Sequence, residues 1–506
     1  MTATNSYDLL VIGGGINGAG VARDAAGRGL SVLLVEQDDL ASATSSWSSK
    51  LVHGGLRYLE QYEFRLVREA LEEREVLMRV APHLVHPLRF VLPHAPGMRP
   101  FWFLRLGVWL YDRLGHRVTL PGGQSVRFPH AQLSAGLKSG YRRGLSYFDC
   151  RVDDARLTVI NAMGAREKGA TIRTRTRFVS AQRVQGAWSA QIEDVIQGKR
   201  DTVQARAIVN AAGPWVMKAL ASIEHRPTPA KVRLVKGSHI VVPRIHGFDH
   251  AYTLQNPDKR IVFVIPYEEQ FSLIGTTDVA VDSPESARDI SAEETRYLLE
   301  SVNRWLTTPL AESDIVWSYA GVRPLYDDGS DNPSAITRDY TLVVEDEGGA
   351  APAVNIFGGK ITTYRCLAES VMENLQPYFP AMGAPWTGAA PLPGGETGFI
   401  EGFIYEFTDR LPHIREPYLT QLISRHGTRV GQVIGNATTP GDLGRDFGAA
   451  LTEREIDYLI EHEWARTAED ILWRRTKCGL HLSAEQRAAV ADYVSARVES
   501  RSQTAI

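Results

Sequence analysis

A glycine-rich turn near the N-terminus constrains the fold of this chain more than any other sequence feature. The turn, Gly13-x-Gly15-x-x-Gly18, follows the apolar run Tyr7–Ile12 and leads into the helix-like segment Asn17–Arg28, which is rich in small residues. The first glycine permits a tight turn, the second lets a ligand approach the backbone, and the third lets helix and strand pack closely. The pattern therefore predicts the start of a β-α-β unit that binds a dinucleotide.

An acidic residue stands where such a unit holds a ribose. A second apolar run, Ser31–Val35, is followed by Glu36, 18 residues after Gly18. A carboxylate there accepts hydrogen bonds from ribose hydroxyls and repels a 2′-phosphate, which argues against NADP. The start of the helix offers free N–H groups to a pyrophosphate. The predicted adenine-dinucleotide residues are Gly13, Gly14, Gly15, Asn17, Gly18, Glu36 and Gln37.

Two later glycine turns favour FAD over NAD as the dinucleotide. The run Ala205–Ala212 is typical of a buried strand, and Gly213-Pro214 ends it. Much later, Gly358-Gly359-Lys360 precedes another helix-like segment. A long flavin stretched across a domain could use both turns, whereas a nicotinamide cofactor would rarely need the second.

The composition is that of a large globular protein with unevenly placed charge. The chain has 506 residues, 43% of them hydrophobic, which is enough for several cores. Its three cysteines are too few and too scattered for a disulfide framework or a metal cluster, so we expect a reducing compartment and no metal. Between Leu77 and Tyr147, ten basic residues oppose one acid, whereas 390–506 carries 13 basic and 17 acidic residues. This asymmetry suggests that one face meets an anionic partner.

The segment Met98–Arg117 is the candidate for a membrane contact. It combines five aromatic residues and four leucines with four arginines, so it is too short and too charged to span a bilayer. Aromatic rings at the headgroup level and arginines on anionic lipid are typical of a peripheral anchor. A core helix beneath a basic surface is the alternative, and the sequence leaves it open.

Patterns outside these motifs predict the remaining elements. A charged helix over Gln61–Val80 precedes a region that Pro82, Pro87 and Pro93 predict to be irregular. The stretch Thr171–Gln204 alternates like antiparallel strands. After a linker at Pro391–Gly395, helices are predicted over Tyr418–His426, Thr452–Arg466, Ala468–Thr476 and Ala484–Glu499.

Several motifs together resemble one family. They are VIGGGINGAG, ATSSWSSKLVHGGLRYLE, GPWV, KGSHIVVP, GTTD, SYAGVRPL, ITRDYTL and FGGKITTYR. Their order and spacing resemble those of the FAD-dependent glycerol-3-phosphate dehydrogenases over nearly the whole chain, and most closely the aerobic respiratory branch in bacteria. The glycerophosphate oxidases of the family carry an insertion, and its mitochondrial members carry EF-hands; neither feature is recognised in this sequence.

The resemblance implies an α/β fold with a glutathione-reductase-type FAD-binding domain, a mixed-sheet substrate domain and a C-terminal α-helical domain. The three domains would comprise, in turn, about 1–80, 145–225 and 335–389; about 81–144 and 226–334; and 390–506. The family oxidises sn-glycerol 3-phosphate to dihydroxyacetone phosphate by hydride transfer to flavin N5 and passes the electrons to membrane quinone. Such an enzyme would be cytoplasmic and peripherally bound to the inner face of the cell membrane. We expect no nucleic-acid partner, and a homodimer and the mode of flavin attachment stay open.

Oxidation of a secondary alcohol needs a group for the hydroxyl proton, and a phosphate needs cations. His53 could take the proton as a neutral imidazole, and the charge of Lys360 could favour an alkoxide or reduced flavin. Arg57, Arg323 and Arg338 each interrupt an apolar or small-residue context. Taken singly, such residues are as often a core histidine or a buried ion pair, but their motifs favour ligand contacts.

The predicted site follows from these motifs. The catalytic candidates are His53, Lys360 and Arg323. The substrate-binding candidates are Arg57, Tyr58, Thr276, Arg323 and Arg338, and which arginine faces the phosphate stays open. The further cofactor-binding candidates are Thr44, Ser45, Ser46, Ser49, Lys50, Gly54, Gly213, Gly358, Gly359, Lys360, Ile361 and Thr362.

Other functions compete with this prediction. The same site could serve an oxidase that passes electrons to O2. A flavin-binding protein without turnover is a second alternative, which the intact set of His53, Lys360 and three arginines disfavours. An amine-oxidising relative, such as a sarcosine-type oxidase, would not need the three arginines.

Overall fold

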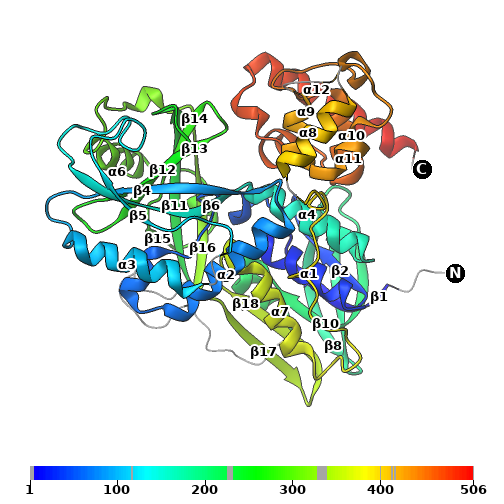
Figure 1. Ribbon diagram of the computed structural model, residues 1–506. Helices are drawn as coiled ribbons and strands as arrows, with labels where there is room; N and C mark the ends of the chain where they lie inside the picture. Colours follow the sequence, from blue (N-terminus) through cyan, green and yellow to red (C-terminus); the bar gives the residue numbers. More distant parts are fainter. Residues whose placement is uncertain are drawn as a thin grey trace.

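The computed structural model describes residues 5–115, 118–224, 232–326, 339–398, 400–411, 414 and 418–504. These residues form two large β-sheets with covering helices and a group of helices at the C-terminal end (Figure 1). The C-terminal helices, drawn in orange and red, lie over the part of the molecule that holds the first helix of the chain. Across the described ranges, no helix is both long enough and apolar enough to cross a membrane.

The first sheet is built around the glycine-rich unit. Its strands are β1 (Ser6–Ile12), β2 (Val32–Val35), β7 (Thr171–Arg173), β8 (Thr176–Val184), β9 (Ala187–Asp194), β10 (Arg200–Asn210), β17 (Thr341–Glu347) and β18 (Ala350–Phe357). Strands β7, β2, β1, β10 and β18 run parallel in this order, while β8, β9 and β17 pair antiparallel. All of β2 is buried, because a central parallel strand is covered on both faces.

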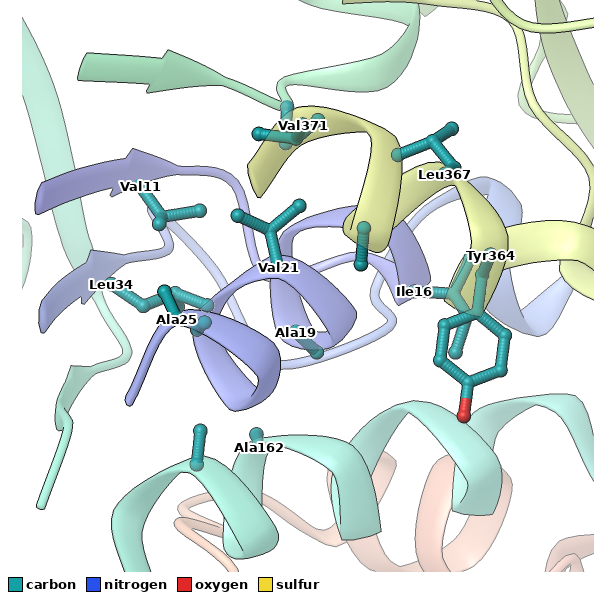
Figure 2. Packing of buried hydrophobic residues seen from close by; sticks show 14 of the residues in the cluster. Val11, Ile16, Ala19, Val21, Ala25, Leu34, Ala162, Tyr364, Leu367 and Val371 are labelled. Atoms are coloured by element: carbon teal, nitrogen blue, oxygen red, sulfur yellow. The ribbon is translucent and has the colours of Figure 1, made fainter. Parts of the chain in front are cut away.

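Three helices pack together against one face of this sheet. They are α1 (Ile16–Gly27), α4 (Asp154–Glu167) and α7 (Tyr364–Leu375). Figure 2 shows Val21 of α1 between Val11 of β1 and Val371 of α7. The Asn161 side chain of α4 donates a hydrogen bond of 3.0 Å to the hydroxyl of Tyr364, which joins α4 to α7. The small side chains of α1 let both helices approach it, so the glycine turn has a rigid support.

The second sheet is mostly antiparallel. Its strands are β3 (Leu51–Val52), β4 (Val85–Pro93), β5 (Gln124–Arg127), β6 (Arg143–Val152), β11 (Val232–Pro243), β12 (His250–Gln255), β13 (Ile261–Tyr267), β14 (Phe271–Gly275), β15 (Val279–Val281) and β16 (Trp317–Tyr326). Side chains alternate across it: Ile240 and Val242 pack with α6 (Ala292–Asn303), whereas Val241 packs with the opposite core, which includes side chains of α2 (Phe64–Val80) and α3 (Phe101–Leu114).

The C-terminal helices have a hydrophobic core of their own. They are α8 (Ile400–Arg410), α9 (Tyr418–His426), α10 (Val430–Ile434), α11 (Glu453–His462), the π-helical turn η9 (Asp470–Arg475) and α12 (Ala484–Thr504). The α/β fold class with a C-terminal helical domain is therefore confirmed. The helix predicted over Ala468–Thr476 is this shorter π-helical turn, and π-helical turns are often found at functional sites.

Two expectations are wrong. The region predicted to be irregular contains β4, whose prolines Pro87 and Pro93 lie outside Arg89–Val91, the part of the strand that pairs on both sides. The domain boundary at about residue 145 divides β6, which pairs with β4 along its whole length and so belongs to the second sheet. Strand β3 also joins that sheet. The other predicted boundaries stay predictions.

Candidate cofactor and substrate site

The glycine turn connects β1 to α1 at the carboxyl end of the parallel strands. Gly13 has a φ of +109°, and a Cβ there would come within 2.6 Å of the carbonyl oxygen of Ala211. A Cβ on Gly18 would lie 2.0 Å from the carbonyl oxygen of Gly13, so this glycine permits the close packing of helix on strand. Gly14 also serves packing, since its Cβ would meet the Glu36 side chain at 2.8 Å.

Glu36 leaves β2 beside this turn. Its carboxylate accepts hydrogen bonds from the backbone N–H groups of Gly14, at 2.7 Å, and Asp38, at 2.8 Å. Burial nevertheless raises the pKa of Glu36 to about 7, and Asp38 and Asp39 add to the rise. A ligand that donates hydroxyl hydrogen bonds to this carboxylate would stabilise its ionised form.

A cavity of about 1300 Å³ joins most of the predicted site residues. Pockets that bind drug-sized ligands have volumes of roughly 300–1,000 Å³, so this larger cavity has room for an extended dinucleotide and a small substrate together. The predicted residues that line it are Gly13, Gly15, Asn17, Glu36, Gln37, Thr44, Ser45, Ser49, His53, Arg57, Tyr58, Gly213, Thr276, Arg323, Gly358, Gly359, Lys360, Ile361 and Thr362.

The two later glycine turns meet the first one across the cavity. Gly358 and Gly359 have φ values of +75° and +94°, and the Asn17 amide donates a hydrogen bond of 3.3 Å to the Gly358 carbonyl. Gly213 has a φ of +54° and open space where a Cβ would stand. Together with Glu36 and the N-terminal end of α1, these turns fit an adenine dinucleotide whose length spans the domain.

The polar segment after β2 divides into two groups. Thr44 and Ser45 line the cavity; the Thr44 hydroxyl donates to the Val322 carbonyl at 2.6 Å, and the Ser45 hydroxyl accepts from the Ile16 N–H at 2.9 Å. Ser46 instead donates to the Ala43 carbonyl at 3.2 Å, away from the cavity lining. It therefore supports the local turn and lies outside the site predicted for it.

Lys50 does not lie in the cavity wall either. Its buried ammonium group binds Asp154 at 2.9 Å and the Ser46 carbonyl at 2.8 Å. A buried charge needs such a partner, and Asp154 supplies it, so the structure places Lys50 in an ion pair with α4 instead of on the cofactor. Gly54 is also outside the lining: a Cβ there would lie 2.7 Å from the Tyr111 hydroxyl, which makes it a packing glycine.

His53 and Lys360 lie at the same part of the cavity. The backbone N–H of His53 donates a hydrogen bond of 3.3 Å to the Thr362 hydroxyl. This bond joins the segment after β3 to η6 (Ile361–Thr363). The Lys360 ammonium lies 3.9 Å from the centre of the Tyr58 ring, a cation–π contact. The His53 imidazole meets the Phe263 ring edge-on. Residues from three segments that are distant in the sequence thus form one wall.

Arg323 of β16 is held by a carboxylate on the loop after β14. Its Nη1 lies 2.7 Å from Asp278 Oδ1, and its Nη2 donates to the Thr276 hydroxyl at 3.3 Å. Asp278 and Thr276 line the cavity with it. Arg57, on η2 (Leu56–Gln61), lines the cavity as well, whereas Arg338 lies outside the described residues.

Sequence reasoning missed several residues at this site. Asp278 completes the GTTD motif, so the motif itself was the available signal. His239 lies in KGSHIVVP, and its Nε2 is 2.9 Å from the Ser49 hydroxyl. Burial, with the nearby charge of Arg323, places the pKa of His239 well below its usual value, so this imidazole is neutral. Asp149 and Phe263 also line the cavity, but neither lies in one of the sequence motifs.

Comparison with known proteins agrees with this architecture. A model of the FAD-dependent oxidoreductase family matches residues 8–365, and a model of the C-terminal domain of alpha-glycerophosphate oxidase matches residues 386–501. The solved structure of glycerol-3-phosphate dehydrogenase from Bacillus halodurans complexed with FAD is 25% identical, with a TM-score of 0.73, and the match covers 98% of this chain and 95% of that one. Both findings define a flavin-dependent oxidoreductase with FAD as its cofactor.

Sequence relatives narrow this class. The chain is 52% identical over 499 residues to aerobic glycerol-3-phosphate dehydrogenase from Escherichia coli K12, and the match covers 98% of each chain. It is also 51% identical over 497 residues to D-erythritol 1-phosphate dehydrogenase from Brucella abortus, covering 97% of this chain and 98% of that one. The chain therefore belongs to the FAD-dependent glycerol-3-phosphate dehydrogenase family.

Proposed function

We propose that this enzyme oxidises sn-glycerol 3-phosphate to dihydroxyacetone phosphate and passes the electrons to membrane quinone. The observation that carries the proposal is the cavity itself, because the dinucleotide residues line it together with His53, Lys360, Arg57 and Arg323. Bound FAD supplies the hydride acceptor in this chemistry. Dehydrogenases of this substrate are among the relatives with which the chain shares half of its residues, which supports the choice of substrate.

The chain's own groups supply the acid–base and electrostatic parts of the reaction. His53 accepts the proton of the substrate hydroxyl, and its N–H bond to Thr362 holds the backbone in place for this role. Lys360 stabilises the developing alkoxide by its positive charge. The side chains of Phe90 and Phe263 line the same cavity, and an apolar wall strengthens both effects because it excludes water.

The phosphate group is assigned to the arginines. Arg323 presents its guanidinium to the cavity while Asp278 fixes one of its nitrogens, which preserves the fork that suits a phosphate. Arg57, Tyr58 and Thr276 line the same cavity and complete the proposed phosphate contacts. Arg338 remains a candidate from its motif alone.

A second substrate has a specific observation in its favour. A relative that acts on D-erythritol 1-phosphate is as similar to this chain as the glycerol-3-phosphate dehydrogenases are. The experiment that separates them compares kcat/KM for sn-glycerol 3-phosphate and D-erythritol 1-phosphate with one quinone analogue. We expect at least a tenfold preference for glycerol 3-phosphate. A preference of that size for the erythritol ester would overturn the substrate assignment.

The surface of α3 supports docking on a membrane. Trp102, Leu106 and Trp109 are 67%, 50% and 50% exposed, and with Arg113 they form one stripe along the helix. Arg105 is exposed beside them. This stripe of apolar and basic side chains suits the boundary between lipid headgroups and acyl chains. Figure 1 places α3 at the outer edge of the molecule, away from the C-terminal helices. We infer peripheral binding to the anionic inner face of the cell membrane.

The same helix supports the choice of quinone as electron acceptor. Leu104, on the inner side of α3, lines the cavity with Phe90 and Leu92 of β4. An apolar wall between the lipid-facing helix and the cavity suits a lipid-soluble acceptor. Comparing the rate of quinone reduction with the yield of hydrogen peroxide tests this choice. Quinone reduction should exceed peroxide formation by far, and a stoichiometric peroxide yield would assign an oxidase.

Liposome binding tests the role of α3. Changing Trp102, Leu106 and Trp109 to serine should release the enzyme from anionic vesicles, because the exposed apolar side chains that would insert among the lipids are lost. Tyr405 is 78% exposed on α8 and provides the matched control, since Tyr405→Ser should leave binding unchanged. Equal partitioning of the triple variant and the unchanged enzyme would contradict the proposed membrane face.

A further inference from the structure

The C-terminal domain reaches the segment that carries Glu36. Asp39 follows Glu36 by three residues and is fully buried. Its carboxylate accepts hydrogen bonds from Arg474 Nε at 2.7 Å, Arg475 Nη1 at 2.6 Å and Arg475 Nη2 at 2.8 Å. Both arginines belong to η9 of the C-terminal domain. A carboxylate next to the ribose-binding position is therefore held by a domain that begins more than 300 residues later in the chain.

The π-helical form of η9 accounts for this contact. Neighbouring residues of a regular α-helix point in different directions and do not meet the same group. In η9, Arg474 and Arg475 both reach Asp39. The buried Arg475 also donates to the Glu463 carbonyl at 2.5 Å, and Glu463 forms an ion pair with Arg156 of α4. The turn is thus held by Asp39 on one side and by Glu463 on the other. π-helical turns are often found at functional sites.

A second contact holds the same segment from the other edge. Asp470, the first residue of η9, accepts bonds of 2.9 and 2.8 Å from the Arg175 side chain. The backbone N–H of Arg175 donates to the Asp38 carbonyl at 2.9 Å, and the N–H of Thr176 donates to the Glu36 carbonyl at 2.7 Å. Asp470 therefore positions the connection between β7 and β8, which borders the Glu36–Asp39 segment.

The C-terminal domain also contributes directly to the cavity. Thr467, Glu469, Asp470 and Arg474 line the cavity that Glu36, Gln37 and Asp38 line. Burial alone would raise the pKa of Asp470. The nearby charges of Arg474, Arg475 and Arg175 outweigh this effect and hold the pKa of Asp470 below its usual range. These acidic and basic groups pair with one another, so the loss of one member leaves a buried charge without its partner.

We propose that the C-terminal domain is part of the FAD site and acts at its adenosine end. Arg474 and Arg475 hold Asp39, and Asp470 holds Arg175, so that Glu36 stays in position for the ribose hydroxyls. Arg474 and Asp470 complete the cavity wall there. These are positioning residues, and the proposal concerns retention of the cofactor whichever polyol phosphate is the substrate.

A neighbouring ion pair provides a matched control. Lys477, two residues after η9, is buried, and its ammonium group binds the carboxylate of Asp153 at 2.9 Å. Asp153 is the N-cap residue of α4. This pair also joins the two domains, but neither residue lines the cavity. Lys477→Met therefore removes a buried interdomain charge without touching the proposed adenosine end.

The test compares Arg474→Met, Arg175→Met and Lys477→Met in the full-length protein. For each apoprotein, the Kd for FAD is measured by quenching of flavin fluorescence, the affinity for ADP by competition with FAD, and stability by thermal unfolding. Loss of a charged hydrogen bond predicts that the FAD and ADP Kd values rise about tenfold or more in Arg474→Met and Arg175→Met. Lys477→Met should unfold at a lower temperature yet bind both ligands as before.

Three results would overturn the proposal. They are an unchanged FAD Kd in both arginine variants, an equal rise in Lys477→Met, and a rise in the FAD Kd without any change for ADP. The Arg175→Met variant is included in case Arg474→Met does not fold. Arg175 is partly exposed, so its replacement disturbs the buried core least. If Arg474→Met does not fold, Arg175→Met alone decides the outcome by the same criteria.

Discussion

Tyr111 of α3 donates a hydrogen bond to Asp149 of β6, and its hydroxyl lies 2.8 Å from each carboxylate oxygen. Arg74 of α2 binds the same carboxylate at 2.8 Å, and the N–H of Gly54, next to His53, lies 3.4 Å from it. Asp149 therefore connects the helix with the exposed apolar stripe to the segment that carries the proposed base. Burial raises the pKa of both Asp149 and Tyr111, so the pair is sensitive to the loss of either partner.

Replacing Tyr111 by phenylalanine should lower both stability and turnover. The ring stays, but Asp149 loses a donor inside the protein, which costs about 1–3 kcal/mol. We expect kcat/KM to fall severalfold as the His53 segment loosens. Tyr252→Phe is the control, because its buried hydroxyl donates to the Ala135 carbonyl on the other face of the second sheet. Equal losses of kcat/KM in the two variants would show that Asp149 does not position the site.

Replacing His53 by glutamine should remove the proposed base and leave the cofactor bound. General-base catalysis contributes about 10²–10⁴-fold, so the rate of flavin reduction by substrate should fall within that range. The ratio of flavin to protein absorbance serves as the control and should not change. A loss of less than threefold would assign the proton to another group.

Replacing Arg323 by lysine should weaken substrate binding. Lysine keeps the charge but loses the planar fork that Asp278 orients, so kcat/KM should fall about tenfold to a hundredfold. Asp278→Asn should give a smaller loss, since the arginine remains. Arg244, which pairs with Asp249 outside the cavity, provides the control variant Arg244→Lys. Unchanged kinetics in Arg323→Lys would remove this arginine from the phosphate site.

The pH dependence of FAD binding should report on Glu36. Burial raises its pKa to about 7, so the carboxyl is mostly protonated at pH 6 and mostly ionised at pH 8. The ionised form accepts hydrogen bonds from the ribose, which makes the FAD Kd about tenfold lower at pH 8 than at pH 6. The Glu36→Gln apoprotein should show a flat profile over this range. A slope that persists in the variant would assign the titration elsewhere.

The same shift predicts how the apoprotein's stability varies with pH. The folded carboxyl binds its proton more tightly than the unfolded one, whose pKa is 4.5. The contribution of Glu36 to stability therefore falls as the pH rises from about 4.5 to 7 and is constant above that. Glu36→Gln should be more stable than the unchanged apoprotein at pH 8 and lose that advantage at pH 4. Urea unfolding at both pH values measures the difference.

Local patterns in the sequence predicted the first sheet well. The glycine turn, the two apolar runs and Glu36 lie within 36 residues, and short-range signals of this kind determine β1, α1 and β2. β4 was not predicted, because its prolines are tolerated only through a pairing pattern set by β6 and β12. Long-range pairing of this kind leaves no trace in a single segment.

The candidate site divides in the same way. Residues inside motifs, such as His53 and Lys360, were predicted, and the cavity brings them together. Lys50 stands in the same motif as His53, yet its partner is Asp154, more than 100 residues away. Arg474 and Arg475 were missed because their partner, Asp39, lies more than 430 residues before them. Only the fold shows which buried charges form pairs.

Anaerobic titration of the purified enzyme with sn-glycerol 3-phosphate measures whether this substrate reduces the bound flavin. The absorbance of the bound flavin is followed as substrate is added without oxygen or quinone. We expect loss of the oxidised flavin spectrum with a stoichiometry of one dihydroxyacetone phosphate per flavin, and recovery of the spectrum when a quinone analogue is added. An oxidised spectrum that persists at saturating substrate would contradict the proposed oxidation of sn-glycerol 3-phosphate.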